Sequence, residues 1–183
     1  MAATRSTAEA QRALAVASAT RVFARAGYHA TPVAAVAADA GISPAYVFRL
    51  FDGKLGLFTA AVDHCFADVV AALRAGAERA ADRSPEAVLD AMGLAYAELI
   101  ADEDLLRFQV HTQSATDVPE IREALRRGLA SVVDVVTELS GATPEAVQRF
   151  VAWGQLCHLV VTAGLDDVPN SWARTLSAGL RHF

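Results

Sequence analysis

Apolar residues recur along this chain at spacings of three and four rather than two, which predicts helices and no strands. All six prolines fall where such a repeat begins, and four of them directly follow Ser or Thr, as is typical of a capped helix start. The expected fold class is therefore all-α. The pattern predicts nine helices, at residues 7–26, 32–39, 44–50, 54–81, 85–101, 103–114, 118–139, 144–164 and 169–182.

The short helices predicted at 32–39 and 44–50 stand only a few residues apart, with Gly41 in the connection. Glycine suits the left-handed turn that a tight connection between two helices requires. Val47 and Phe51, four residues apart, continue in the second helix the apolar face that begins in the first. Two short helices joined by a glycine-containing turn are typical of a helix-turn-helix, whose second helix lies in the major groove of DNA.

The residues around this motif are more specific than its spacing. They are VFARAGYHAT (22–31), VAADAGIS (36–43) and FRLFDGK (48–54). These stretches resemble F-x-x-x-G-[YF]-x-x-[TS], I-A-x-x-A-G-V-S and L-Y-x-[YH]-F-x-[SN]-K, the pattern of the TetR (tetracycline-repressor type) family of bacterial transcription regulators. The resemblance covers roughly the first third of the chain, and the remainder matches the family in length and helical content.

The resemblance implies an organisation and a function for the whole chain. Residues 1–52 would form a three-helix DNA-binding domain, and residues 53–183 a helical domain for ligand binding and dimerisation. The protein would be a transcriptional regulator and not an enzyme, a repressor that leaves its operator when a small organic effector binds the second domain. The implied partners are a palindromic double-stranded DNA operator and a second copy of the chain, because two half-sites require two readers. No cofactor is implied.

We expect DNA contacts along the second short helix and at the starts of its two neighbours. Tyr46 and Arg49 lie away from the apolar face of the second helix, so we expect them to reach base edges or phosphates. Thr31 is expected to cap its helix beside a phosphate, and Lys54 matches the family's phosphate-contacting lysine. The full set is Thr31, Ser43, Pro44, Ala45, Tyr46, Phe48, Arg49 and Lys54.

The sequence departs from the family pattern at three positions that contact phosphates or cap a helix. Phe48 stands where the family has a phosphate-binding tyrosine, Leu50 where it has tyrosine or histidine, and Gly53 where it has a capping serine or asparagine. Each lost hydrogen bond removes about 0.5–1.5 kcal/mol. We therefore expect a DNA reader with an altered phosphate clamp, or one in which Tyr46 and Arg49 compensate.

Charge is distributed unevenly between the two parts of the chain. Residues 1–58 hold six basic side chains against three acidic ones, a net charge of +3. Residues 59–183 hold ten basic against eighteen acidic, a net charge of −8. The formal net charge of −5 thus hides a basic N-terminal part, where a phosphate backbone would bind.

The last two predicted helices are candidates for the dimer interface. Helix 144–164 is apolar nearly all round, which indicates burial from more than one side. Helix 169–182 carries one apolar stripe, formed by Trp172, Leu176, Leu180 and Phe183. The resemblance implies that both helices pair with their copies, whereas sequence alone also allows a core within one chain. The predicted dimer residues are Val160, Trp172, Leu176 and Leu180.

The resemblance also implies an effector site among the helices between 54 and 164. Aromatic side chains with a few polar groups suit an amphipathic organic ligand, although such residues at helical spacing also fill ordinary cores. The candidates are Phe66, Met92, Tyr96, Phe108, His111, Trp153 and Cys157.

Two alternative functions stay open at the level of the sequence. His64-Cys65 and Cys157-His158 suggest a metal sensor, but adjacent residues on a helix point about 100° apart, so a metal would need both pairs. A helical interaction module that has lost DNA binding would also fit the changes at Phe48 and Leu50. No metal ligand set is assigned.

Other features of the sequence indicate a cytoplasmic protein. It shows no hydrolase, metalloprotease, nucleotide-binding or dinucleotide-binding signature. No stretch of eighteen apolar residues lacks charge, and no signal peptide is visible, so we expect no membrane span. Cys65 and Cys157 stand among apolar neighbours and are expected to be buried free thiols.

Overall fold

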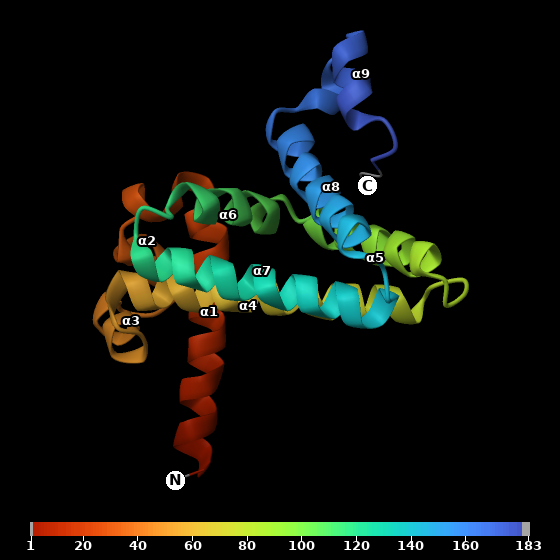
Figure 1. Ribbon diagram of the computed structural model, residues 1–183. Helices are drawn as coiled ribbons and strands as arrows, with labels where there is room; N and C mark the ends of the chain where they lie inside the picture. The colour runs from red at the N-terminus through yellow and green to blue at the C-terminus, as the bar shows by residue number, and fades with distance from the viewer. Residues whose placement is uncertain (1, 181–183) are drawn as a thin grey trace. The chain divides into compact units, whose positions relative to one another are not determined.

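The structure is a computed structural model that describes residues 2–180, with side chains from residue 8 onward (Figure 1). Throughout these residues the regular elements are helical, so the predicted all-α class is confirmed. The helices are α1 (Ala2–Ala30), α2 (Val33–Asp39), α3 (Pro44–Leu50), α4 (Gly53–Glu78), α5 (Pro85–Ile100), α6 (Glu103–Ser114), α7 (Pro119–Ser140), α8 (Pro144–Thr162), a 3₁₀ turn η1 (Leu165–Asp167) and α9 (Ser171–Ser177).

Ser-Pro and Thr-Pro pairs start three of the helices in the way the sequence predicts. Ser43, Ser84 and Thr143 stand just before α3, α5 and α8, with proline at the first helical position. Each hydroxyl oxygen accepts a hydrogen bond from the backbone N–H three residues on, at 3.2, 3.3 and 3.4 Å respectively. These bonds satisfy a donor that the first helical turn leaves without a partner.

The predicted capping role of Thr31 is wrong. The helix starts one residue later than expected, so Pro32 is the cap residue of α2, and no side chain caps that helix. The Thr31 side chain is instead only 3% exposed. Its hydroxyl has no hydrogen-bond partner among the described residues. Packing within the domain has turned this side chain inward, and its contact with DNA stays a prediction.

The end of the chain is also less helical than predicted. The helix expected at 169–182 is limited to α9, Ser171–Ser177, because the backbone leaves the helical conformation at Ala178. The predicted stripe is therefore interrupted before Leu180, and Phe183 lies outside the described residues.

The chain divides into two compact units. The first contains residues 1–66 and 107–128, and the second contains residues 67–106 and 129–183. The first unit therefore includes more than the helix-turn-helix, since it also takes the end of α6 and the start of α7. A separate functional boundary after residue 52 stays a prediction.

An aromatic cluster forms the centre of the first unit. The Phe58 ring of α4 packs edge-on against Phe23 and Tyr28 of α1, with ring centroids 4.8 and 5.0 Å apart. Phe108 of α6 lies 5.2 Å from Phe58 on another side. Phe23, Phe58 and Phe108 are almost fully buried. Offset and edge-on aromatic contacts of this kind fix α1, α4 and α6 together.

One helix, α4, is long and apolar enough to cross a membrane by length and composition alone. The bent pair α2 and α3 would pass the same test if counted as one span. The core helix of a globular domain passes it as well, so this finding is weak evidence for a membrane span.

Candidate nucleic-acid interface

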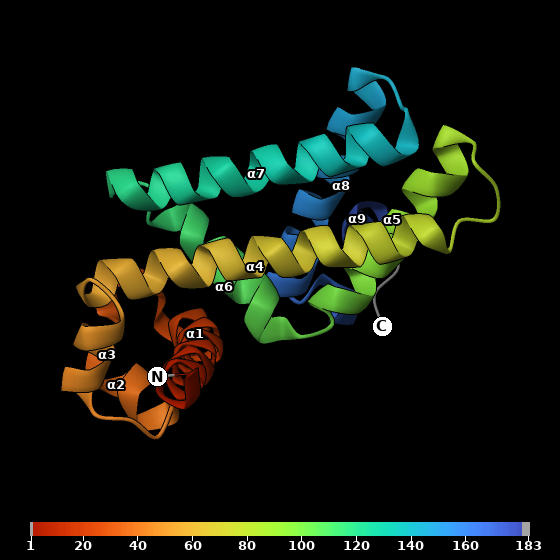
Figure 2. The same cartoon turned by 90° about the horizontal axis from the view of Figure 1, so that it is seen from below.

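The helices α1, α2 and α3 contact one another and form a three-helix platform, seen in Figures 1 and 2. Val36 and Ala37 of α2 and Val47 of α3 are fully buried at its centre. Gly41 has φ +67°, the left-handed conformation that the sequence predicts for the turn. The buried apolar face therefore fixes which side of α3 is directed to solvent.

The opposite side of α3 is exposed and has few polar groups. Ser43, Pro44, Ala45, Phe48 and Arg49 are exposed on it. The Phe48 side chain is 57% exposed, an unusual position for a phenyl ring in a folded domain. The structure thus brings five of the eight predicted DNA-contacting residues onto one continuous surface.

Tyr46 and Arg49 lie next to each other at the edge of this surface. The Arg49 guanidinium carbon is 4.4 Å from the centroid of the Tyr46 ring, which is a cation–π contact. Tyr46 is half-buried whereas Arg49 is exposed. The stacking holds the guanidinium plane in place while leaving its N–H groups available to a base or a phosphate.

Arg12 of α1 supports the C-terminal end of α3, a role that the sequence analysis missed. Its guanidinium donates a hydrogen bond to the Leu50 carbonyl, one of the last carbonyls of the helix. The guanidinium carbon also lies 4.2 Å from the centroid of the Phe51 ring. A cation at the C-terminus of a helix is favoured by the helix dipole. Nothing in the local sequence near Arg12 indicates this contact, because its partners are about forty positions away.

Arg21 and Asp39 connect α1 to the end of α2. The Arg21 guanidinium donates to the Asp39 carboxylate and, at 3.0 Å, to the Ser18 hydroxyl. The hydrogen bond from Arg21 is the main cause that lowers the pKa of the Asp39 carboxyl. Because the pair is partly exposed, it contributes little to stability and mainly sets the helix orientation.

Lys54, the predicted phosphate-contacting lysine, is held by the end of α1. Its Nζ donates to the His29 carbonyl at 3.2 Å and lies 4.8 Å from the Tyr28 ring centroid. Partial burial lowers the pKa of the Lys54 ammonium group. An ammonium group has three donors, so the bond to His29 leaves two of them for a phosphate.

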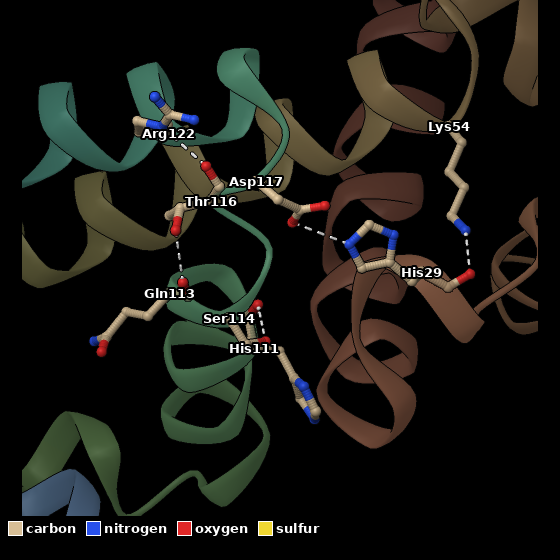
Figure 3. A network of polar contacts seen from close by, with 8 residues as sticks. All are labelled: His29, Lys54, His111, Gln113, Ser114, Thr116, Asp117 and Arg122. Atoms are coloured by element: carbon tan, nitrogen blue, oxygen red, sulfur yellow. Dashed lines mark hydrogen bonds and ion pairs between the residues drawn. The ribbon is translucent and has the colours of Figure 1, made fainter.

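Figure 3 shows the polar contacts that continue from His29 to the connection between α6 and α7. The His29 Nε2 atom lies 3.2 Å from Asp117 Oδ1. Arg122 Nε donates to the Thr116 carbonyl at 2.9 Å, and the Thr116 hydroxyl donates to the Gln113 carbonyl at 3.0 Å. The end of α1 and the α6–α7 connection are thereby joined within the first unit.

His111, a predicted ligand residue, takes part in the same junction. Its ring lies against Gly27, where the backbone of α1 is interrupted with φ +70° and ψ −177°. A Cβ atom at residue 27 would be only 2.8 Å from His111 Nδ1. The close approach of the imidazole therefore requires glycine at this position. The sequence places Gly27 four residues after Phe23, as the family pattern does, but this spacing gives no indication that His111 is the partner.

The N-terminal helices match a known family of DNA-binding proteins. Residues 15–61 match the family profile described as "Bacterial regulatory proteins, tetR family". This part of the chain is a TetR-family DNA-binding domain. Its helix-turn-helix consists of α2 and α3, and the resemblance read from the sequence is confirmed.

Solved structures of bacterial transcription regulators have a similar fold over nearly the whole chain. A TetR-family regulator from Agrobacterium tumefaciens superposes with a TM-score of 0.71 at 18% identity, covering 95% of each chain. FadR from Bacillus subtilis, solved with stearoyl-CoA, gives 0.69 at 16% identity, covering 91% of this chain and 94% of its own. The fatty acid degradation regulator FadR from Bacillus halodurans superposes with a TM-score of 0.64 at 19% identity. The superposition covers 94% of this chain and 97% of that regulator. No curated protein sequence matches the chain.

Beyond the TetR-family domain, the predicted effector residues fall into two groups. Phe66, Phe108 and His111 belong to the first unit, and Met92, Tyr96, Trp153 and Cys157 to the second. Phe66 and Phe108 are buried by neighbouring side chains, and Phe66 packs so close to Gly128 that a Cβ atom there would lie 2.2 Å from its ring. For both residues the structure thus supplies a packing role.

Trp153 does not line an interior site. Its side chain is 51% exposed on α8, with the ring near Gly179. In the single chain the ring is thus directed to the surface of α8, and a contact between Trp153 and an effector stays a prediction. An exposed tryptophan suits a surface that another protein chain covers.

A hydrogen-bonded Tyr–His pair lies in the second unit. The Tyr96 hydroxyl is 2.7 Å from Nε2 of His158, a residue that the sequence analysis considered only for metal binding. His158 is buried, and burial lowers its pKa from 6.5 to about 4, so the imidazole is neutral near pH 7. Its Nδ1 atom has no hydrogen-bond partner among the described residues. Burial also raises the pKa of the neighbouring Cys157 thiol.

The predicted dimer residues are divided between an internal core and the surface. Val160 is fully buried in a small cluster with Leu165 and Ala173, and Leu176 and Leu180 pack partly against it. Its own chain already covers Val160, so its place in a dimer interface stays a prediction. The large apolar side chains of α8 and α9 that are exposed are Trp153, Leu159 and Trp172.

Both cysteines are free and buried, as predicted. Within residues 2–180, no three His, Cys, Asp or Glu side chains are grouped so that they could hold a metal ion.

Proposed function

We propose that this chain is a cytoplasmic transcriptional repressor that binds a palindromic operator as a homodimer and leaves it when a small organic effector binds. The observation that carries the DNA-binding part is the exposed face of α3, which stands on a buried apolar platform inside a TetR-family domain. A helix of seven residues presented in this way fits the width of the major groove.

The charges of the first unit support binding to phosphates. Arg12 and Lys54 already contact the ends of helices, and Arg21 is paired with Asp39, so these three chiefly order the platform. Arg49 remains exposed on the reading face. We infer that Arg49 gives the main charged contact, with Tyr46 holding its guanidinium.

Capture of genomic fragments followed by sequencing tests this function. Purified protein is expected to enrich a few fragments that contain an inverted repeat, and their affinity is expected to fall steeply with salt. Arg49→Ala is expected to weaken binding at least tenfold, while Arg83→Ala, an exposed arginine of the second unit, is expected to leave it unchanged. No enrichment at low salt would favour an interaction module over a repressor.

For the effector, we propose an amphipathic organic molecule. The support comes from the apolar interior of the second unit, where Met92 is fully buried and the Tyr96–His158 pair supplies hydrogen-bonding groups. FadR from Bacillus subtilis, of similar fold, is described with stearoyl-CoA. Stearoyl-CoA and shorter acyl-CoA thioesters are therefore suitable first probes.

An effector is expected to raise the Tm of the protein and to release captured DNA, since it must prefer the state that does not bind the operator. Tyr96→Phe is expected to weaken both effects without changing DNA affinity in the absence of effector. A probe that raises Tm but leaves the protein on DNA would contradict the repressor-release mechanism.

A further inference from the structure

The centre of the reading face of α3 is apolar. Successive residues of an α-helix are rotated by about 100°. Phe48 consequently projects between Pro44 and Ala45, and all three side chains are exposed. The nearest cation, Arg49, is turned toward Tyr46 at one edge of the face, 4.4 Å from its ring. Direct contact with DNA at the centre must therefore be made by carbon atoms.

The Phe48 ring is supported from one side. A Cβ atom at Gly53 would lie 3.7 Å from the ring, which is ordinary van der Waals contact. The ring thus rests beside the backbone at the start of α4, while 57% of the side chain remains exposed.

In the major groove, the only apolar group on a base edge is the 5-methyl group of thymine. Phenylalanine has no donor or acceptor with which to reach a phosphate or a polar base edge. Small neighbours such as Pro44 and Ala45 allow the helix to approach the bases closely. The exposed ring therefore matches one base and excludes a favourable contact with the others.

We propose that Phe48 is a specificity-determining residue that reads thymine through its 5-methyl group, one thymine or a pair of them in each half-site. The inference rests on the proposed binding of DNA by α3 and adds the base that the helix selects. Pro44 and Ala45 form the walls of the methyl-binding surface, and Arg49 contacts the backbone or a purine beside it.

The test uses operator duplexes in which deoxyuridine replaces thymidine, one position at a time. This change removes the methyl group alone and keeps base pairing. The parent duplex is selected by the full-length wild-type protein from a random-sequence library, and Kd is measured by fluorescence anisotropy. At one or two positions in each half-site, deoxyuridine is expected to weaken wild-type binding about three- to fivefold, the effect of one buried methyl group.

Phe48→Ala is expected to bind the parent duplex more weakly and to show no further loss with deoxyuridine at those positions. Phe48→Tyr keeps the ring and is expected to keep the sensitivity. Leu14→Ala is the control, since Leu14 is similarly exposed, at 53%, on the same platform. It lies about 200° around α1 from Arg12, which contacts α3.

Three results would overturn the proposal. The first is a wild-type Kd that deoxyuridine changes at no position. The second is a loss of affinity with deoxyuridine that is as large in Phe48→Ala as in the wild type. The third is a selected site without thymine in its half-sites. If the protein selects no duplex at all, the result would instead contradict the proposed DNA binding, and the inference would fall with it. Circular dichroism of each variant shows that the helices are intact.

Discussion

The guanidinium carbon of Arg12 in α1 lies 4.2 Å from the centroid of the Phe51 ring, which follows the last turn of α3. The same guanidinium donates to the Leu50 carbonyl. One side chain therefore joins the first helix to the C-terminal end of the reading helix. The orientation of α3 depends on this contact as well as on the buried Val47.

Arg12→Ala is expected to lower the free energy of unfolding by about 1–2 kcal/mol, since a cation–π contact and a charged hydrogen bond are both lost. Arg12→Lys keeps the charge and is expected to recover about half of the lost free energy of unfolding. An ammonium group lacks the planar geometry with which guanidinium makes both contacts. Urea denaturation measures both values. Equal stability of Arg12→Ala and wild type would show that the contact is not maintained in solution.

Gly27→Ala is expected to destabilise the protein by about 2–4 kcal/mol. The backbone at residue 27, with φ +70° and ψ −177°, lies in a region that is essentially restricted to glycine. A Cβ atom there would also approach His111 Nδ1 to 2.8 Å. The double variant Gly27→Ala/His111→Ala relieves the clash but keeps the backbone strain, so it is expected to recover only part of the loss.

Gly41→Ala provides the matched comparison for Gly27→Ala. Its φ of +67° is also left-handed, but a Cβ atom would meet nothing within 4 Å. Its expected cost is about 1 kcal/mol, from backbone strain alone. Thermal denaturation should find Gly27→Ala the least stable, Gly27→Ala/His111→Ala intermediate and Gly41→Ala the most stable of the three. A Gly41→Ala variant as unstable as Gly27→Ala would contradict the assigned role of His111.

Gly76 and Gly93 are helical glycines for which opposite effects are expected. A Cβ atom at Gly76 in α4 would lie 2.7 Å from the Ala91 carbonyl oxygen, a backbone atom that cannot move aside easily. Gly76→Ala is therefore expected to destabilise by about 2 kcal/mol or more. At Gly93 the nearest atom is 3.8 Å away, in the Phe150 ring, so Gly93→Ala is expected to stabilise α5 by about 0.5–1 kcal/mol. Chemical denaturation measures whether each variant has a lower or a higher free energy of unfolding than the wild type.

His158 is expected to make the stability of the protein depend on pH. Burial lowers its pKa from 6.5 to about 4, so below pH 6.5 the unfolded chain binds a proton that the folded chain excludes. The contribution of His158 is complete above pH 6.5, falls as the pH decreases, and is lost by about pH 4. Since one pKa unit corresponds to about 1.4 kcal/mol, the full loss is about 3 kcal/mol.

His158→Gln isolates this contribution, because glutamine does not titrate. The difference in unfolding free energy between pH 7.5 and pH 4 is expected to be smaller in the variant by about 3 kcal/mol. The other groups that titrate in this range are common to both proteins and cancel in the comparison. Parallel stability curves for the two proteins would mean that His158 has the same pKa in the folded and the unfolded chain.

Trp172→Asp is expected to weaken dimerisation about thirtyfold or more, as removal of a central interface tryptophan does. Trp172 is 54% exposed on α9, so the fold of the single chain does not depend on it. Val133→Asp changes an exposed apolar residue of α7 and is the control. Sedimentation velocity at several concentrations measures the effect, and an unchanged dimer in Trp172→Asp would place the interface elsewhere.

The sequence by itself determined the helices and the nature of the reader. Their starts are encoded locally, because a hydroxyl followed by proline satisfies the first turn without help from the rest of the chain, as at Ser43 and Thr143. The turn at Gly41 and the buried face at Val47 are likewise fixed by residue type and spacing. The family profile over residues 15–61 confirms that this local pattern was sufficient to identify a DNA-binding domain.

Only the tertiary structure decided which of the candidate side chains are available. By sequence, Thr31 is a candidate helix cap and Val160 a candidate residue of the dimer interface. Packing within the chain buries both side chains. Arg12 and His158 gave no local signal, because their partners, Leu50 and Tyr96, lie 38 and 62 residues away. Helical periodicity reports the direction of a side chain on its own helix, and the burial or pairing of that side chain depends on what the other helices bring against it.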